Sequence, residues 1–191
     1  EHLLHKLYAF LLTKKDSIVT VSTNQAKYTA KHNGIPQNKF TTIHNGIDLR
    51  YWHPSTDDSD RLSIRKTYGI PADASVIVMT AALRIEKNHI GAVKALHLLH
   101  TVYNQKAYLL MVGDGVMKEE ILKLARELNL TDYVKITGMQ KEVRPFYWAS
   151  DLFTLTSTSV ETFSIAALEA MGCGLPSVLT NIGGASEMVR D

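Results

Sequence analysis

Two cations stand three residues apart in segment 82–88, between an apolar run and an amphipathic stretch. Arg84 can bind phosphate oxygens through two parallel N–H donors, and Lys87 adds a compact point charge. The pair therefore indicates a site for a polyanion such as a diphosphate. A solvated loop in which Arg84 pairs with Glu86 is the alternative interpretation, and the pair alone does not decide between them.

Two carboxylates lie farther along the chain, Glu161 just before a predicted helix and Glu169 within it. Eight residues at a helical rise of about 1.5 Å separate them by about 12 Å along the axis. This spacing suits the ends of an extended ligand, a sugar and a ribose joined through a diphosphate, because carboxylates accept hydrogen bonds from vicinal hydroxyls. The helix start would also offer backbone N–H groups to the phosphates.

Both carboxylates have structural alternatives. Glu161 near a helix start favours the helix dipole without any ligand, and Glu169 could lie on the surface. Yet Glu169 stands among Ala166, Leu168 and Met171. A carboxylate buried in so apolar a stretch needs a hydrogen-bond partner.

Glycines mark two further turns. Gly113 and Gly115 resemble the start of a dinucleotide-binding fingerprint, but Lys118 stands where its third glycine would be. We therefore expect a strand-to-helix turn that needs positive φ rather than a dinucleotide site. Gly183 and Gly184 either let the backbone approach a ligand closely or form a plain tight turn, and both interpretations stay open.

Histidine and cysteine offer little chemistry. His2 with His5, and His97 with His100, are three apart on predicted helices, but no cysteine or carboxylate cluster accompanies them. We therefore expect no metal site. Cys173 lies at an apolar helix end rich in small residues and is expected to belong to the core rather than to act as a nucleophile.

The elements that must position these residues follow from the hydrophobic pattern. From residue 75 onward, apolar runs alternate with amphipathic stretches, which indicates a parallel sheet covered on both faces. Right-handed crossovers then give an α/β fold, a Rossmann-like doubly wound parallel sheet whose ligands bind at the carboxyl ends of the strands. Strands are predicted at 76–79, 108–112, 134–136, 152–155 and 177–179, with helices at about 90–99, 117–128, 141–149 and 163–172.

The first sixty residues are organised differently. Residues 1–13 have the period of an amphipathic helix, for which a core-facing position is favoured over a membrane surface. A strand at 17–21 and a helix at 24–32 follow. Residues 51–60 combine Pro54 with a polar run and are the best candidate for a linker or domain seam.

Composition limits the remaining possibilities. The 191 residues correspond to about 1.3 domains of ordinary size, with 45% hydrophobic and 21% charged residues as in globular proteins. A net charge of +2 is too balanced for nucleic-acid binding as the main activity, and no apolar run is long enough to span a membrane. The chain lacks a starting Met and stops in a helix just under way, so we expect a piece of a longer protein.

Taken together, the order and spacing of these segments resemble glycosyltransferase family 4 (group 1), the retaining nucleotide-sugar transferases of the GT-B fold. The resemblance runs from about Ile18 to the end of the chain. It rests on residues 44–48 (the family's Asn-Gly-Ile/Val-Asp segment), Arg84 with Lys87 (Arg-x-Glu-Lys-Asn), 113–115 (Gly-x-Gly), Glu161 with Glu169 (paired glutamates) and 169–176 (the usual continuation).

The resemblance implies a role for each matching residue. Arg84 and Lys87 would bind the donor diphosphate and stabilise the leaving nucleotide, and Glu161 would contact hydroxyls of the transferred sugar. Glu169 would hold the ribose hydroxyls. The donor-binding set is completed by Gly113, Thr162 and the residues that present backbone N–H groups, namely Phe163, Ser164 and Ile165.

Three positions depart from the family pattern. Thr162 and Ser164 stand where the family usually has glycine, and Thr156 stands where it has proline. Side chains at 162 and 164 narrow the space near the donor sugar. These departures are expected to affect which donor sugar fits, with the backbone contacts retained.

The same resemblance implies a domain plan. Residues 1–43 would be the end of an N-terminal acceptor-side domain, and 44–191 a C-terminal nucleotide-sugar-binding domain truncated at its end, together the C-terminal half of a GT-B fold with the last elements before it. Since the family's catalytic cleft lies between its two domains, the chain would hold the donor half, and we expect it to be inactive alone.

The implied activity is that of a retaining, metal-independent hexosyltransferase. It would move a hexosyl group from a UDP- or GDP-linked sugar to a hydroxyl of a glycan or lipid-linked acceptor, without a cofactor and without nucleic acid. The full-length protein would be cytoplasmic, with peripheral association at the cytoplasmic face of a membrane left open. The alternatives are an isolated nucleotide-sugar-binding module without turnover and a GT-B sugar-nucleotide epimerase.

Overall fold

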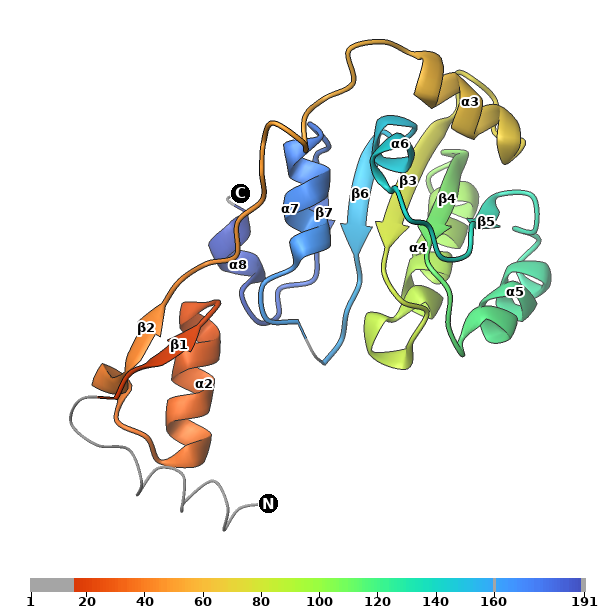
Figure 1. The fold of residues 1–191 in the computed structure, drawn as a ribbon. Coiled ribbons are helices and arrows are strands. Elements are labelled where there is room, and N and C mark those ends of the chain that lie inside the picture. Colours follow the sequence, from red (N-terminus) through yellow and green to blue (C-terminus); the bar gives the residue numbers. More distant parts are fainter. Residues whose placement is uncertain (1–15, 160, 190–191) are drawn as a thin grey trace. The chain divides into compact units, whose positions relative to one another are not determined.

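A computed structural model describes residues 16–159 and 161–189 (Figure 1). The chain divides into two compact units. Within the described residues, the larger comprises 47–159 and 165–180, and the smaller comprises 16–46, 161–164 and 181–189. The helix expected over residues 1–13 lies outside the described residues, and a domain division at residues 43 and 44 stays a prediction.

The larger unit is built on a parallel sheet of five strands in the order β5-β4-β3-β6-β7 (Figure 1). From the centre of the sheet, the chain adds β3, β4 and β5 toward one edge and then β6 and β7 toward the other. This reversal is typical of a doubly wound sheet. The predicted fold class is therefore confirmed, with a strand at each predicted place: β3 (Ser75–Thr80), β4 (Ala107–Val112), β5 (Val134–Ile136), β6 (Leu152–Leu155) and β7 (Ser177–Leu179).

The core of this unit lies along the central strands. Val78 of β3 pairs in register with Leu110 of β4 and with Phe153 of β6, and all three side chains are fully buried. Apolar side chains on both faces of a strand require helices on both sides. Accordingly α4 (His89–Thr101) packs against α5 (Lys118–Glu127), and α6 (Arg144–Trp148) packs against α7 (Ile165–Gly172).

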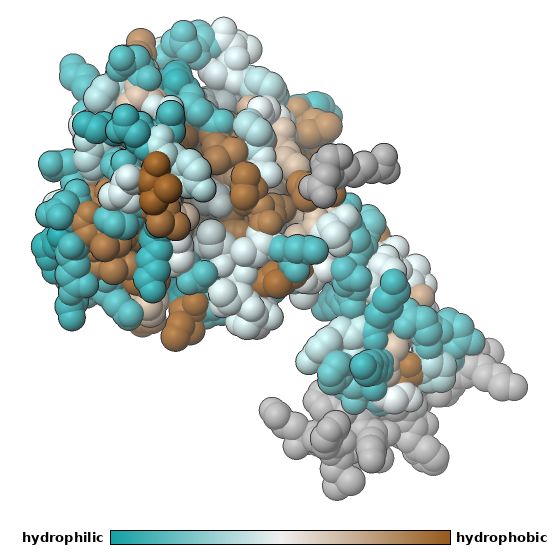
Figure 2. All heavy atoms as spheres, turned by 180° about the vertical axis from the view of Figure 1, so that it is seen from behind, coloured by the Kyte–Doolittle hydropathy of each residue, from teal (hydrophilic) through white to brown (hydrophobic). Residues whose placement is uncertain are grey.

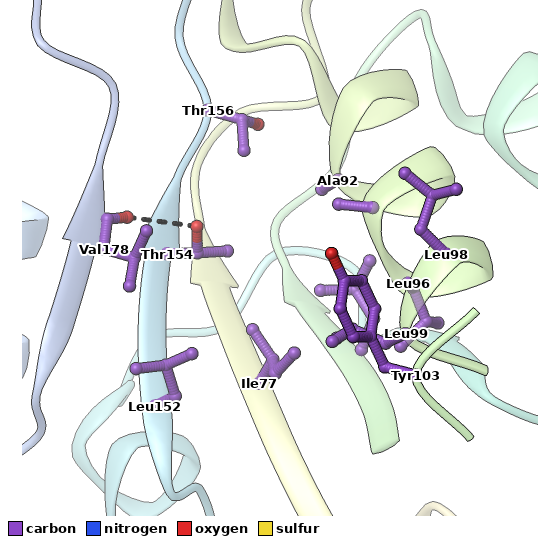
Figure 3. A pocket seen from close by; sticks show the side chains of 12 residues that line it. Ile77, Ala92, Leu96, Leu98, Leu99, Tyr103, Leu152, Thr154, Thr156 and Val178 are labelled. Carbon is purple, nitrogen blue, oxygen red and sulfur yellow. Dashed lines mark hydrogen bonds between the residues drawn. The ribbon is translucent and has the colours of Figure 1, made fainter. Parts of the chain in front are cut away.

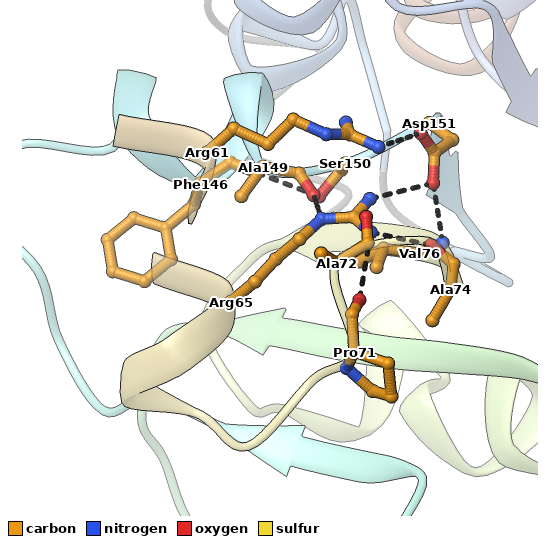
Figure 4. Close-up of polar contacts among 10 residues, drawn as sticks. All are labelled: Arg61, Arg65, Pro71, Ala72, Ala74, Val76, Phe146, Ala149, Ser150 and Asp151. Carbon is orange, nitrogen blue, oxygen red and sulfur yellow. Dashed lines mark hydrogen bonds and ion pairs between the residues drawn. The ribbon is translucent and has the colours of Figure 1, made fainter. Parts of the chain in front are cut away.

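Helix α3 (Ser59–Thr67) begins inside the polar run that the sequence suggested as a linker, and a buried arginine holds it (Figure 4). Arg65 is 1% exposed. Its Nε donates to the carbonyl of Ala149 at 2.9 Å, and its Nη2 donates to Asp151 Oδ2 at 3.0 Å. Its Nη1 donates to three carbonyl oxygens between α3 and β3, those of Pro71, Ala72 and Ala74.

In the smaller unit, two short parallel strands pair with each other, β1 (Ile18–Thr20) and β2 (Phe40–Thr42), and the helix α2 (Thr23–Asn33) lies between them in the chain. The Ser22 side chain caps α2 by accepting from Gln25 N, and Gly34 ends the helix with φ 66°. The expected strand and helix are thus confirmed, whereas β2 was not predicted from the sequence. The unit also holds η1 (Gln37–Lys39) and the short helix α8 (Ala185–Met188).

Candidate functional site

The loops after β3 and β6 are tied together in the larger unit. Thr158 N donates to the Glu86 carbonyl at 2.9 Å. The Thr156 hydroxyl donates to the carbonyls of Lys87 at 3.2 Å and Asn88 at 3.0 Å. Since the strand order reverses between β3 and β6, these loops flank the point where doubly wound sheets bind ligands. The Thr156 hydroxyl thus supports segment 82–88, the loop that carries Arg84 and Lys87 and is called the cation loop below.

Arg84 lies between β3 and the single turn η2 (Ile85–Lys87). Its side chain is 63% exposed, and its Nη1 lies 3.6 Å from Glu86 Oε1. The ion pair proposed as the alternative interpretation is therefore present, but at this distance it is not a hydrogen bond. A phosphate could still take the donors of this guanidinium. Lys87, partly exposed, ends the same turn.

A buried histidine that was not predicted as a site residue lies directly after the cation loop. His89 begins α4 and is 2% exposed, and within the described residues neither of its ring nitrogens has a partner at good hydrogen-bond geometry, although the Arg84 backbone lies near enough to oppose the fall in its pKa. Burial, aided by the charge of Lys87, lowers the pKa of His89 to about 4, so the ring is neutral at pH 7. It lines a cavity of about 240 Å³ together with Arg84, Ile85, Asn88, Ile90, Met117 and Glu120.

The glycine turn after β4 fits against the loop after β3. Gly113 has φ 150° and Gly115 has φ 157°. A Cβ on Gly113 would collide with the Ala81 carbonyl, and one on Gly115 with the Leu83 carbonyl. The glycines are thus explained by backbone packing, as expected for a strand-to-helix turn, while a donor contact of Gly113 stays a prediction.

Glu169 on α7 has the partner that its apolar surroundings require. The Tyr147 hydroxyl, on α6, donates to Glu169 Oε2 at 3.2 Å. Burial raises the pKa of Glu169, and the hydrogen bond from Tyr147 opposes that rise. Tyr147 is itself fully buried and was not singled out from the sequence, because its aromatic ring reads as an ordinary core residue.

Segment 161–164 belongs to the smaller unit. Phe163 and Ser164 are buried, while Glu161 is partly exposed and Thr162 exposed. Since α7 begins only at Ile165, residues 161–164 are not helical, and the helical rise assumed from Glu161 onward does not apply to them. The carbonyls of Thr162 and Phe163 instead accept hydrogen bonds from Gly184 N and Asn45 Nδ2.

An apolar cavity in the larger unit is lined by none of the predicted catalytic or donor-binding residues (Figure 3). It has a volume of about 320 Å³ and lies between α4 and strands β3, β6 and β7. Side chains of Ile77, Leu152 and Val178 from the strands and of Leu96 and Leu99 from α4 line it. It contains no cation or carboxylate among its lining residues and is suited to apolar contacts rather than to chemistry.

The surface of the larger unit is mixed, with apolar patches set in hydrophilic surroundings (Figure 2). No helix among the described residues is long and apolar enough to cross a membrane. In the same part of the chain, no three or more His, Cys, Asp or Glu residues gather as metal ligands would. Cys173 is buried, as expected, and burial raises the pKa of its thiol to about 11.

Comparison with known proteins gives consistent matches. A family described as glycosyl transferases group 1 matches residues 60–191. The chain is 31% identical over 188 residues to the N-acetyl-alpha-D-glucosaminyl L-malate synthase of Bacillus anthracis. The matched region covers 98% of this chain and 47% of that protein. It is 25% identical over 185 residues to a D-inositol 3-phosphate glycosyltransferase of Thermobispora bispora, with 92% and 42% covered. The chain thus spans less than half the length of these relatives.

Solved structures share the fold. A glycosyltransferase from Rickettsia africae ESF-5 superposes with a TM-score of 0.88 at 23% identity, over 100% of this chain and 51% of that one. Anabaena Alr3699/HepE in complex with UDP gives a TM-score of 0.82 at 25% identity, over 92% and 48%. The same Anabaena protein in complex with UDP-glucose gives 0.85 at 24% identity, over 100% and 52%. These matches agree with half of a GT-B fold.

Proposed function

Because this chain belongs to the glycosyl transferases of group 1, we propose that it forms the nucleotide-sugar-binding part of a glycosyltransferase. The observation that carries the proposal is the cation loop, which holds Arg84 and Lys87 where the strand order reverses between β3 and β6. Open parallel sheets bind their ligands at this point. The full-length protein would be the enzyme, and this chain would supply its donor site.

The proposed reaction moves a hexosyl group from a nucleoside-diphosphate sugar to a hydroxyl acceptor, a glycan or a lipid-linked saccharide, with retention. The acceptor oxygen attacks the anomeric carbon on the face that the nucleotide leaves. The bond from that carbon to the diphosphate breaks, and the acceptor proton passes to the departing diphosphate or to solvent.

Arg84 and Lys87 would stabilise the charge that develops on the leaving diphosphate. Fixed cations that face developing charge lower a barrier without reorganising during the step. Two cations on one short loop can replace the divalent ion that other phosphate sites use, which supports a metal-independent reaction. No cofactor is required, since the nucleotide sugar is itself the substrate.

The remaining candidates would recognise the donor. Glu169 would accept from the ribose hydroxyls, since a carboxylate held by Tyr147 at one oxygen still offers further lone pairs. Glu161 and Thr162 would contact the sugar. Backbone N–H groups of Phe163, Ser164 and Ile165, with the turn at Gly113, would complete the donor-binding set.

The nucleotide is proposed to be UDP or GDP. The complexes of the Anabaena protein with UDP and with UDP-glucose support a uridine donor. Calorimetry of the 191-residue chain with UDP, GDP and ADP tests this proposal. We expect one of the first two to bind with saturable heat, and the absence of heat with all three would contradict the proposed function.

The Lys87→Ala variant tests the cation loop, with Lys94→Ala as its control, because Lys94 is an exposed lysine on the following helix. In the full-length protein we expect Lys87→Ala to lower kcat by about 100-fold or more, with Lys94→Ala close to the unaltered protein. Equal kinetics in the two variants would exclude a catalytic role for Lys87.

A product assay separates the enzyme from a binding module. Turnover by the full-length protein in the presence of a chelator, with the anomeric configuration of the product read by NMR, tests both metal independence and retention. An inverted product, or turnover that stops with the chelator, would contradict those parts of the proposal. Nucleotide binding without any product would favour the module.

A further inference from the structure

The carboxylate of Glu187 on α8 is an anchor within the smaller unit. Its Oε2 accepts from Thr23 N and its Oε1 accepts from Asn24 N, each at 2.9 Å. His44 Nε2 lies 3.0 Å from Oε2 and must donate, because an ionised carboxylate only accepts. Burial would raise the pKa of Glu187, but the hydrogen bonds from Asn24, Thr23 and His44 outweigh it and hold the pKa at about 2.

His44 connects Glu187 to segment 161–164, the proposed sugar-binding segment, because it contacts both. The imidazole of His44 stacks on the ring of Phe163, with 4.7 Å between centroids and 10° between planes. The next residue, Asn45, donates through Nδ2 to the Phe163 carbonyl at 3.0 Å. Phe163 is therefore held at both its ring and its backbone.

The opposite side of the segment is held by the turn that precedes Glu187. Gly184 N donates to the Thr162 carbonyl at 2.8 Å, and Asn24 Nδ2 donates to the Gly183 carbonyl at 2.7 Å. A Cβ on Gly183 would collide with the Glu161 carbonyl. The paired glycines thus serve a close approach between two parts of this chain.

We propose that Glu187 is a positioning residue for donor-sugar recognition, acting through His44 and the start of α2 to fix the backbone of Phe163 and Ser164. The inference rests on the proposed function, since it assumes that these N–H groups bind the sugar. Glu187 itself touches no ligand. Its loss would leave two helix N–H groups and one imidazole without their acceptor, and the stacked ring would lose its orientation.

A purely structural role and a positioning role differ in their effect on two ligands. UDP alone would use the cation loop and Glu169, which belong to the larger unit. UDP-glucose would also use segment 161–164. A positioning residue should therefore weaken UDP-glucose while leaving UDP unchanged, whereas general destabilisation weakens both.

The test compares Glu187→Gln with Glu127→Gln, the same substitution at an exposed position of α5. By calorimetry on the 191-residue chain, we expect Glu187→Gln to weaken UDP-glucose about tenfold and UDP less than about twofold. The control should change neither. Equal losses for both ligands, or no loss for either, would overturn the proposal.

A second variant, His44→Phe, keeps a ring against Phe163 but removes the nitrogen that reaches Glu187. If Glu187 acts through His44, the two substitutions together should cost little more than one alone. Full additivity would overturn the proposed route through His44.

Amide hydrogen exchange gives a readout that needs no ligand. We expect exchange at Phe163 and Ser164 to quicken in Glu187→Gln, while amides of β3 and β4 keep their rates. Unchanged exchange at 163 and 164 would overturn the inference even if nucleotides bind. Failure of the unaltered chain to bind any nucleotide would instead contradict the proposed function, and this measurement would still decide the role of Glu187.

Discussion

Arg65 and Arg84 carry the same charge in the same unit, but their surroundings are opposite. Arg65 is 1% exposed and donates to four backbone carbonyls and to Asp151. Arg84 has a side chain that is 63% exposed and an ion pair with Glu86 at 3.6 Å. A buried cation needs partners from its own chain, because desolvating it costs more than a surface pair returns. An exposed cation at a strand end can serve an external anion instead.

The largest effect is expected on stability, when Arg65 is replaced, because this cation is hydrogen-bonded by the chain itself. Replacing Arg65 with alanine leaves Asp151 and several carbonyls without their donor, so the free energy of unfolding should fall by about 3–5 kcal/mol. Urea unfolding followed by circular dichroism measures it. Arg126→Ala, on the exposed face of α5, is the control and should cost less than about 0.5 kcal/mol. Equal costs would mean that the Arg65 contacts contribute nothing to stability.

Arg84→Ala should have the opposite effect, with little change in stability and a clear loss of affinity for UDP. Stability should stay within about 0.5 kcal/mol of the unaltered chain, because the side chain is mostly exposed. The affinity for UDP should fall by about 2 kcal/mol, the usual worth of a charged hydrogen bond. Calorimetry beside urea unfolding tests both halves. A stability loss as large as that of Arg65→Ala would remove the contrast between the two arginines.

The smallest effect concerns the pH dependence of ribose binding. Burial raises the pKa of Glu169, and Tyr147 opposes the rise by bonding the ionised form. A carboxyl with a raised folded pKa favours the folded state at low pH and loses that contribution as pH rises through it. Ribose binding needs the ionised form, so UDP affinity should fall as pH drops through this pKa.

Tyr147→Phe should move that fall to higher pH, at a cost of about 1 kcal/mol in UDP affinity on the acid side. Titrations at several pH values measure the shift, and a UDP analogue without ribose hydroxyls is the control. If the analogue shows the same shift, the hydrogen bond of Tyr147 does not act through ribose recognition.

Much of the sheet could be predicted from the sequence. The strand expected at 108–112 is observed as Ala107–Val112, and the one at 152–155 as Leu152–Leu155. Such runs are recognisable because strands buried on both faces consist almost entirely of apolar residues. Helix α3 was missed: its first residues lie in the polar run 51–60, which resembles a linker, and no element was predicted for residues 61–67.

The candidate site was predictable only in part. Arg84 and Lys87 stand out through charge and spacing, which are local properties. Tyr147 does not, because its hydroxyl meets Glu169 from another helix. The start of α7 at Ile165 also escaped prediction, since bonds from Asn45 and Gly184 hold residues 162 and 163 outside the helix.

The sequence by itself determined the family, the parallel sheet and the place of the cation loop, because these follow from hydrophobic period, order and local charge. Only the tertiary structure decided that Arg65 is the arginine whose donors bind the chain itself, and that Tyr147 donates to Glu169. It also decided that Gly183 faces the chain's own Glu161 carbonyl. The physical reason is that burial and hydrogen-bond pairing depend on residues far apart in the chain, which no local pattern records.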